Sequence, residues 1–291
     1  MKTLTPDWHL DVQCQLGEGP LWHPVKQRLY WVDIFNHNLF ASSQDLKTWT
    51  KSHFETPVGA YGFRRDGGFI LATGRGFENW SGQGSKTTPI WNPLPGREGV
   101  RMNDGKVGPG GRFWAGSMDS ADHEAAFYRL DPDGKRHTLL QHIGISNGLG
   151  WSPDRRTFYY TDSMDYTIFA FDFDLETGQI SNQRPFVKLP KDECEVVPDG
   201  LCVDAEGCVW SAQWNGWQIV RYSPEGELLL RVSLPAQRVT SCCFGGPDLT
   251  RLFITTAWVD LTDEERKPQP LAGNVFSCPT DTQGQSVNFF G

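Results

Sequence analysis

A short pattern recurs six times along the 291-residue chain: a polar or glycine-containing turn, then a short strand of aromatic and β-branched residues. One copy is Asp66-Gly67-Gly68 followed by residues 69–73. The six expected strands begin at residues 29, 69, 112, 157, 208 and 252. Repeats of about 40–50 residues with several strands each are typical of β-propellers. The sequence therefore predicts an all-β fold, a six-bladed β-propeller, in which residues 1–291 form one domain.

The start of the chain contains a strand-like segment that has no partner in its own repeat. Residues 8–12 alternate between apolar and polar side chains, as a half-buried strand does. Open sheet edges are a liability that ring closure removes. We therefore expect the N-terminal segment to complete the blade formed by residues 252–290. The charged stretch 261–266 is the one place where we expect a turn of helix.

Composition and charge narrow the range of functions. Lys and Arg number 27 against 35 Asp and Glu, a net charge of −8, which argues against a nucleic-acid surface. No stretch approaches the roughly 20 apolar residues of a membrane helix, and residues 1–10 lack the apolar run of a secretory signal. The seven cysteines show no C-x-x-C spacing, so we expect free thiols in a cytoplasmic protein.

Four of the six repeats place a carboxylate or carboxamide, followed closely by glycine, just upstream of the turn. Glu18, Asn103, Asn147 and Asp199 precede their strands by 11, 9, 10 and 9 residues. Because blades repeat around an axis, residues at one position of the repeat lie on one ring. If that position begins the innermost strand, the four side chains meet at one mouth of the channel. Oxygen ligands without His or Cys suit a hard divalent cation and leave positions for water or substrate.

Two other interpretations of these residues need to be considered. Asn-Gly, Asp-Gly and Glu-Gly are also ordinary turn sequences. Residues 144–148 match the G-x-S-x-G pattern of serine hydrolases, whose nucleophile lies between a strand and a helix. Here a Ser-Pro-Asp turn and another strand follow, so we do not expect Ser146 to be a nucleophile.

Several ordered motifs resemble the regucalcin and gluconolactonase family, also called senescence marker proteins. They are Leu16-Gly17-Glu18-Gly19-Pro20-Leu21-Trp22, Asn103-Asp104-Gly105-Lys106-Val107, Ile145-Ser146-Asn147-Gly148-Leu149, Pro198-Asp199-Gly200 and Thr240-Ser241-Cys242-Cys243-Phe244-Gly245-Gly246. The resemblance extends over nearly the whole chain. It implies a six-bladed propeller that hydrolyses sugar lactones with one divalent metal cation.

The resemblance also implies roles for individual residues. Glu18, Asn147 and Asp199 are expected to hold the metal, and Arg101 and Asn103 to contact the substrate. Family members carry a further acidic contact after the third repeat strand. In this chain the acid is displaced, and Asp119 is the candidate substitute.

The leading hypothesis is a metal-dependent sugar lactonase acting on a small-molecule lactone, with Asp199 as general base. The metal is left open between Ca, Zn, Mn and Fe(II). We expect a monomer or weak dimer that binds neither nucleic acid nor membrane. Two alternatives remain: an organophosphate or aryl-ester hydrolase, and a non-enzymatic calcium-binding regulator or interaction propeller.

Overall fold

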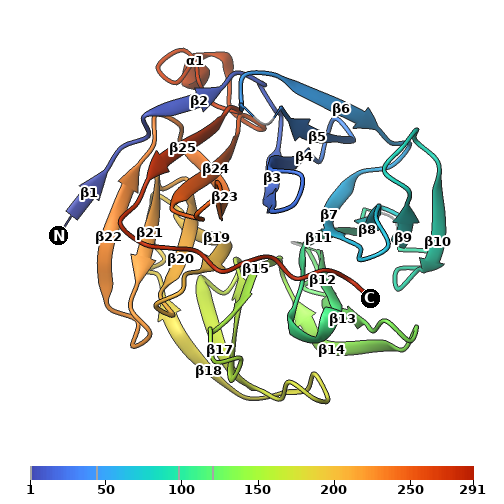
Figure 1. Ribbon diagram of the computed structural model, residues 1–291. Coiled ribbons are helices and arrows are strands. Elements are labelled where there is room, and N and C mark those ends of the chain that lie inside the picture. The colour runs from blue at the N-terminus through green and yellow to red at the C-terminus, as the bar shows by residue number, and fades with distance from the viewer. Residues whose placement is uncertain (1, 44, 98, 120) are drawn as a thin grey trace.

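The computed structural model describes residues 2–43, 45–97, 99–119 and 121–291. Its strands form six sheets arranged in a ring, each sheet being one blade (Figure 1). The innermost strand of each blade contacts the innermost strands of both neighbours, which closes the ring. The prediction of a six-bladed β-propeller is confirmed.

Blades 1 to 4 each consist of four consecutive strands in antiparallel order. From the inside outwards these strands are β3 (Gly17–His23), β4 (Arg28–Asp33), β5 (Asn38–Ser42) and β6 (Trp49–His53); β7 (Val58–Phe63), β8 (Phe69–Thr73), β9 (Gly76–Trp80) and β10 (Thr87–Trp91); β11 (Arg101–Val107), β12 (Phe113–Met118), β13 (Ala125–Leu130) and β14 (Arg136–Ile143); and β15 (Ser146–Trp151), β16 (Thr157–Asp162), β17 (Thr167–Phe173) and β18 (Ile180–Lys188).

Blades 5 and 6 each include a strand from the start of the chain. Blade 5 contains β19 (Val197–Val203), β20 (Val209–Trp214), β21 (Gln218–Tyr222), β22 (Leu228–Ser233) and β1 (Lys2–Leu4), and blade 6 contains β23 (Arg238–Gly245), β24 (Arg251–Ala257), β25 (Val275–Pro279) and β2 (Trp8–Leu10). A single helical turn, α1 (Asp263–Arg266), lies between β24 and β25, and Thr262 caps it. A 3₁₀ turn, Pro109–Gly111, lies between β11 and β12. In the described part of the chain, no helix is long and apolar enough to cross a membrane.

The recurring sequence pattern corresponds to the second strand of each blade. β4, β8, β12, β16, β20 and β24 all begin within one residue of the predicted positions. Aromatic residues of these strands fill the spaces between blades: Trp31, Trp114 and Trp210 are fully buried. Trp114 packs against Trp151 and Phe158 of the next blade. Because a large aromatic ring buries much apolar surface, these contacts contribute strongly to blade packing.

The predicted closure of the ring is confirmed. β2 pairs with β25 in an antiparallel register, with Trp8 opposite Ser277. The Trp8 ring contacts Phe253 edge to face, at 6.4 Å between centroids. β1 extends the closure in a way that the sequence did not indicate, because it pairs in parallel with β22 of blade 5.

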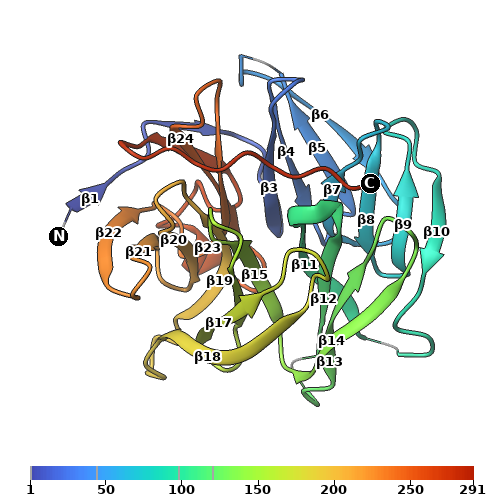
Figure 2. The ribbon, with the colours of Figure 1, turned by 60° about the horizontal axis from the view of Figure 1, so that its bottom comes forward.

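The end of the chain departs from the prediction that residues 252–290 form one blade. The fourth position in blade 6 is taken by β2, and residues 280–291 instead cross one face of the ring (Figures 1 and 2). Gln285 donates to the carbonyl oxygens of Trp151 and Val203, and Asn288 donates to that of Val107. This C-terminal segment thus covers the ends of the inner strands and a cavity of about 500 Å³.

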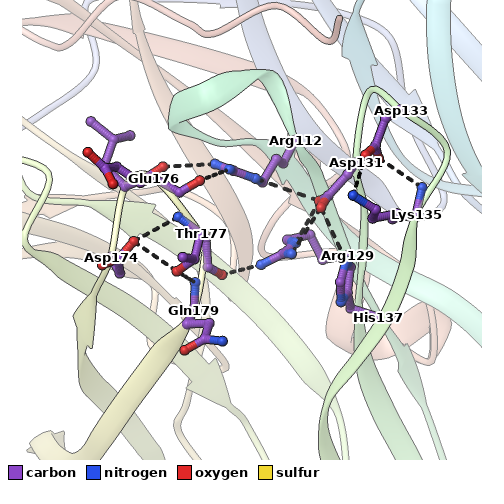
Figure 3. Close-up of polar contacts among 12 residues, drawn as sticks. Arg112, Arg129, Asp131, Asp133, Lys135, His137, Asp174, Glu176, Thr177 and Gln179 are labelled. Atoms are coloured by element: carbon purple, nitrogen blue, oxygen red, sulfur yellow. Dashed lines mark hydrogen bonds and ion pairs between the residues drawn. The ribbon is translucent and has the colours of Figure 1, made fainter.

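A network of polar contacts joins blade 3 to blade 4 (Figure 3). Arg129, buried beneath the surface, donates to the Asp131 carboxylate at 2.6 Å and to the carbonyl oxygen of Gly178 in the β17–β18 turn. Arg112 donates to the carbonyl oxygen of Leu175 at 3.0 Å in the same turn. These contacts join the start of β12 and strand β13 of blade 3 to the β17–β18 turn of blade 4.

Candidate metal and substrate site

All six inner strands are interrupted by a β-bulge or register irregularity near their first residues. We call the end of the ring where these strands begin the bulge end. A bulge re-aims side chains away from the regular alternation of a strand, and bulges are common beside functional sites. The C-terminal segment covers the opposite end, where the inner strands finish.

Three of the four predicted ring residues occupy equivalent positions in these bulges. Asn103, Asn147 and Asp199 are each the first of two residues that oppose a single residue of the second strand. Glu18 lies one position earlier, paired with Val32 immediately before its bulge. Glu18 thus departs by one residue from the shared position that the sequence predicted. Its side chain is also one methylene longer than the Asp199 side chain at the shared position. All four side chains are 4–8 % exposed.

Asn147 is oriented by contacts between blades 4 and 5. Its amide nitrogen donates to the Ser163 hydroxyl at 3.0 Å, and Ser163 donates to the carbonyl oxygen of Pro198 at 2.7 Å. The amide oxygen Oδ1 of Asn147 is buried and has no hydrogen-bond partner among the described residues. Buried acceptors without partners are rare in folded proteins, so this oxygen is available to a ligand.

Asp199 presents a second oxygen of the same kind, because its Oδ1 is also buried and unpartnered within the described residues. Burial raises the pKa of Asp199 well above its usual range, and the carboxylates of Glu18 and Asp104 raise it further. Burial also raises the pKa of Glu18 to about 8, with a further contribution from Asp104. Carboxylates that are buried close together resist ionisation until a positive charge compensates them.

These residues fit a hard divalent cation. The unpartnered oxygens of Asn147 and Asp199, with the carboxylate of Glu18, form the all-oxygen donor set that such cations prefer. Across the described ranges, no three His, Cys, Asp or Glu side chains group closely enough to hold an ion. Binding at this place would therefore depend on the amide oxygen of Asn147.

Arg101 and Asn103 contact each other at the bulge end. The Arg101 guanidinium donates to Asn103 Oδ1 at 2.7 Å, and Asn103 Nδ2 donates to the Ser146 carbonyl oxygen at 2.9 Å. Both polar atoms of the Asn103 amide are thus partnered, unlike those of Asn147. The guanidinium also lies over the Phe35 ring, 5.7 Å from its centroid. Burial lowers the pKa of Arg101 to about 10, so its charge is retained at neutral pH.

Asp119 lies in the loop after β12 and is engaged in local contacts. Its Oδ2 accepts from Arg97 at 2.9 Å, and its Oδ1 accepts from the backbone nitrogen of Asp122 at 3.2 Å. The structure therefore places Asp119 in an ion pair with Arg97. Arg101, the predicted substrate contact, has no ion-pair partner within the described part of the chain. Ser146 is fully buried in β15, which continues as a strand and not into a helix.

Three residues of this region were not identified from the sequence. Asp104 is 7 % exposed and raises the pKa of both Glu18 and Asp199, but its Asn-Asp-Gly context is that of a turn. Ser163 and Phe35 act through contacts with Asn147 and Arg101. No local sequence signal marks either residue.

Fold and site together define a β-propeller with an acid and amide centre at the bulge end of its inner strands. The sequence profile described as SMP-30/Gluconolactonase/LRE-like region matches residues 16–258. Regucalcin of Danio rerio is 40 % identical over 272 residues, which cover 90 % of each chain. The chain therefore belongs to the SMP-30/gluconolactonase/LRE-like family, and the resemblance inferred from the motifs is confirmed.

Solved structures agree with this assignment. A luciferin-regenerating enzyme superposes with a TM-score of 0.88 at 30 % identity and covers 96 % of both chains. A calcium-binding protein, regucalcin, from Agrobacterium tumefaciens superposes with a TM-score of 0.94. The latter is 24 % identical, with 100 % of this chain and 99 % of that chain covered, and it supports the fold alone.

Proposed function

We propose that this protein hydrolyses sugar lactones to the corresponding sugar acids with the help of one divalent cation. The observation that carries the proposal is the pair of buried, unpartnered oxygens of Asn147 and Asp199 beside Glu18. Membership in a family whose description includes gluconolactonase supports the substrate class. When bound, a divalent cation would polarise the lactone carbonyl and stabilise the oxyanion that forms from it.

The protein's own residues would supply the remaining steps. Asp199 would accept a proton from the water that attacks the carbonyl carbon, and its burial makes its carboxylate more basic than an exposed one. The bond from the carbonyl carbon to the ring oxygen then breaks, and the proton passes to that oxygen. The product is an open-chain hydroxy acid.

Arg101 and Asn103 would position the substrate. Arg101 keeps N–H groups beyond its contact with Asn103, and a guanidinium suits vicinal hydroxyls or a developing carboxylate. Asn103 would hold Arg101 in place, because its amide is fixed on the Ser146 carbonyl oxygen.

A substrate panel tests the reaction class. Hydrolysis of pentono- and hexonolactones, an aryl ester and an organophosphate is followed by pH-stat with Ca, Mn, Zn or Fe(II) added in turn. We expect the highest specificity constant for a sugar lactone, and loss of turnover in Asp199→Asn. A preference for the aryl ester or organophosphate would replace the proposed substrate class with the alternative hydrolase activity.

Cation binding without turnover is the second candidate function. Regucalcin from Agrobacterium tumefaciens is described as a calcium-binding protein, and the oxygens of Glu18, Asn147 and Asp199 suit calcium as well as smaller cations. Calcium binding by calorimetry, combined with no hydrolysis on the whole panel, would favour this function.

A further inference from the structure

The register of the bulges distinguishes Asp104 from its counterparts in blades 4 and 5. In blades 3, 4 and 5, two residues of the inner strand oppose one residue of the second strand. The second of the two is Gly148 in blade 4 and Gly200 in blade 5, but it is Asp104 in blade 3. Blade 3 thus carries a carboxylate where blades 4 and 5 carry glycine.

Close packing excludes a side chain from the two glycine positions. A Cβ on Gly148 would lie 2.4 Å from the backbone nitrogen of Leu201, and a Cβ on Gly200 would lie 2.2 Å from the Ser241 hydroxyl. Real Cβ atoms do not approach other atoms so closely. At Asp104, by contrast, the fold accommodates a buried carboxylate, although burying a charge without compensation is costly.

The surroundings of Asp104 contain charges of both signs. Its Oδ1 accepts from the Gly105 nitrogen at 2.6 Å, and within the described ranges it forms no ion pair. The carboxylates of Glu18 and Asp199 are close enough for Asp104 to raise the pKa of each. The positive group that acts on Asp104 is Lys106, whose ammonium donates to the carbonyl oxygens of Leu149 and Leu201 at 3.0 and 2.8 Å.

We propose that Asp104 is an outer acidic group of the cation centre: it increases divalent-cation affinity through its charge without being a ligand. This inference rests on the proposed cation-dependent function. Glu18, Asp104 and Asp199 do not form a three-carboxylate ion site in the described part of the chain, which argues against direct ligation.

Charge balance supplies the physical reason. The carboxylates of Glu18 and Asp199 together balance a divalent cation, but the same two carboxylates also act on the positive charge of Arg101, which forms no ion pair in the described residues. The charge of Asp104 adds to the negative charge around the cation, and Lys106, the positive group that acts on Asp104, limits that contribution. In a buried site, where water screens charges weakly, such a group acts strongly on a bound ion.

Calorimetric titration with Ca²⁺ and with Mn²⁺ tests the proposal. We expect Asp104→Asn to bind each cation roughly 10- to 100-fold more weakly, the range typical of outer-shell groups, and Asp104→Glu to restore most of the affinity. Lys106→Met should bind more tightly than the unmodified protein, an opposite effect that a purely structural role of Asp104 does not predict. Asp162→Asn is the matched control, because Asp162 is similarly buried but accepts from the backbone nitrogens of Gly144 and Ile145.

The outcomes separate this inference from the proposed function. If Asp104→Asn binds as tightly as the unmodified protein while Glu18→Gln loses the cation, the role of Asp104 is wrong and the cation centre stands. If the unmodified protein binds no divalent cation, both fail. Should Asp104→Asn unfold, as judged by circular dichroism, Asp104→Gly replaces it, because glycine is the residue at this position in blades 4 and 5.

Discussion

The Asn147 amide donates to the Ser163 hydroxyl at 3.0 Å, and this contact leaves the amide oxygen of Asn147 as its unpartnered atom in the described structure. Ser163 also donates to the carbonyl oxygen of Pro198, the residue before Asp199. One hydroxyl thus links the candidate ligand Asn147 to the residue that precedes the candidate ligand Asp199 in the next blade. Partners that orient a metal ligand typically contribute roughly 10- to 100-fold to metal affinity.

Replacing Ser163 should therefore weaken cation binding without touching a ligand. We expect Ser163→Ala to reduce divalent-cation affinity about tenfold, because the Asn147 amide becomes free to rotate. Calorimetry measures this, with Ser152→Ala as control, since Ser152 caps a surface turn of the same blade. Unchanged affinity in Ser163→Ala would contradict the orienting role.

Cation binding should depend on pH through Glu18. Its pKa is raised to about 8, first by burial and then by Asp104, so well below pH 8 the cation-free site holds a proton that a cation must displace. We expect affinity to rise as the pH increases through about 8, with a further contribution from Asp199, whose pKa is also raised. Calorimetry in buffers of different ionisation enthalpy should detect proton release at the lower pH. Affinity independent of pH would exclude Glu18 as a ligand.

The raised pKa of Glu18 also makes the stability of the fold depend on pH. Because the pKa of Glu18 in the folded protein lies above its unfolded value, its stabilising contribution is complete at low pH and is lost as the pH rises through about 8. A bound cation favours the ionised carboxylate, so saturating cation should raise Tm more above pH 8 than at mildly acidic pH. An equal rise at both pH values would contradict this linkage.

Arg101 and Asn103 should contact the substrate and should not be ligands of the cation. We expect Arg101→Ala and Asn103→Ala each to lower the specificity constant. The loss should correspond to roughly 1–3 kcal/mol of transition-state stabilisation, the value of a lost hydrogen bond to a charged or neutral group. Cation affinity should change little in Asn103→Ala and should not fall in Arg101→Ala, which removes a positive charge that acts on Glu18 and Asp199. Parallel kinetics and calorimetry check this, and loss of the cation in either variant would place that residue among the ligands.

Phe35 provides a related test, because its ring packs on the guanidinium of Arg101 and is 43 % exposed. Phe35→Leu should raise KM with little change in kcat, since it loosens Arg101 without removing it. Trp49→Leu is the control: Trp49 is also an exposed aromatic residue of blade 1, but it lies on the outermost strand. Equal effects of the two substitutions would assign Phe35 a general stabilising role.

Deleting residues 2–13 should destabilise the ring. The deletion removes the strand that pairs with β25 and the buried Leu10 side chain, so we expect a loss of at least about 3 kcal/mol or aggregation. Deleting only residues 2–5 removes β1, whose first two residues are exposed, and should cost much less. Denaturant unfolding measures both. A deletion of 2–13 that remains as stable as the full chain would show that the ring closes without β2.

Local patterns were enough to predict the blades and their closure, because each blade repeats one turn-and-strand unit and residues 8–12 alternate like a strand. The path of residues 280–291 could not be predicted in this way. It depends on Gln285 and Asn288 bonding to carbonyl oxygens of three blades that lie far away in the sequence. The periodic pattern of the sequence carries no information about contacts between residues so far apart in the chain.

The candidate site could likewise be predicted only in part from the sequence. Spacing placed Asn103, Asn147 and Asp199 at one position, and the structure places them at equivalent bulge positions. Glu18 is offset by one residue because its bulge begins after it, which spacing alone does not reveal. Asp104 resembles a turn residue until the register shows that its counterparts are glycines.

Cation-dependent turnover is the most direct test of the proposed function. Hydrolysis of a sugar lactone is measured by pH-stat after chelation, after removal of the chelator, and after return of a divalent cation, with the spontaneous rate subtracted. We expect chelation to abolish turnover and the cation to restore it in the unmodified protein but not in Asp199→Asn. Full turnover in a preparation verified by elemental analysis to be free of metal would contradict the proposed function.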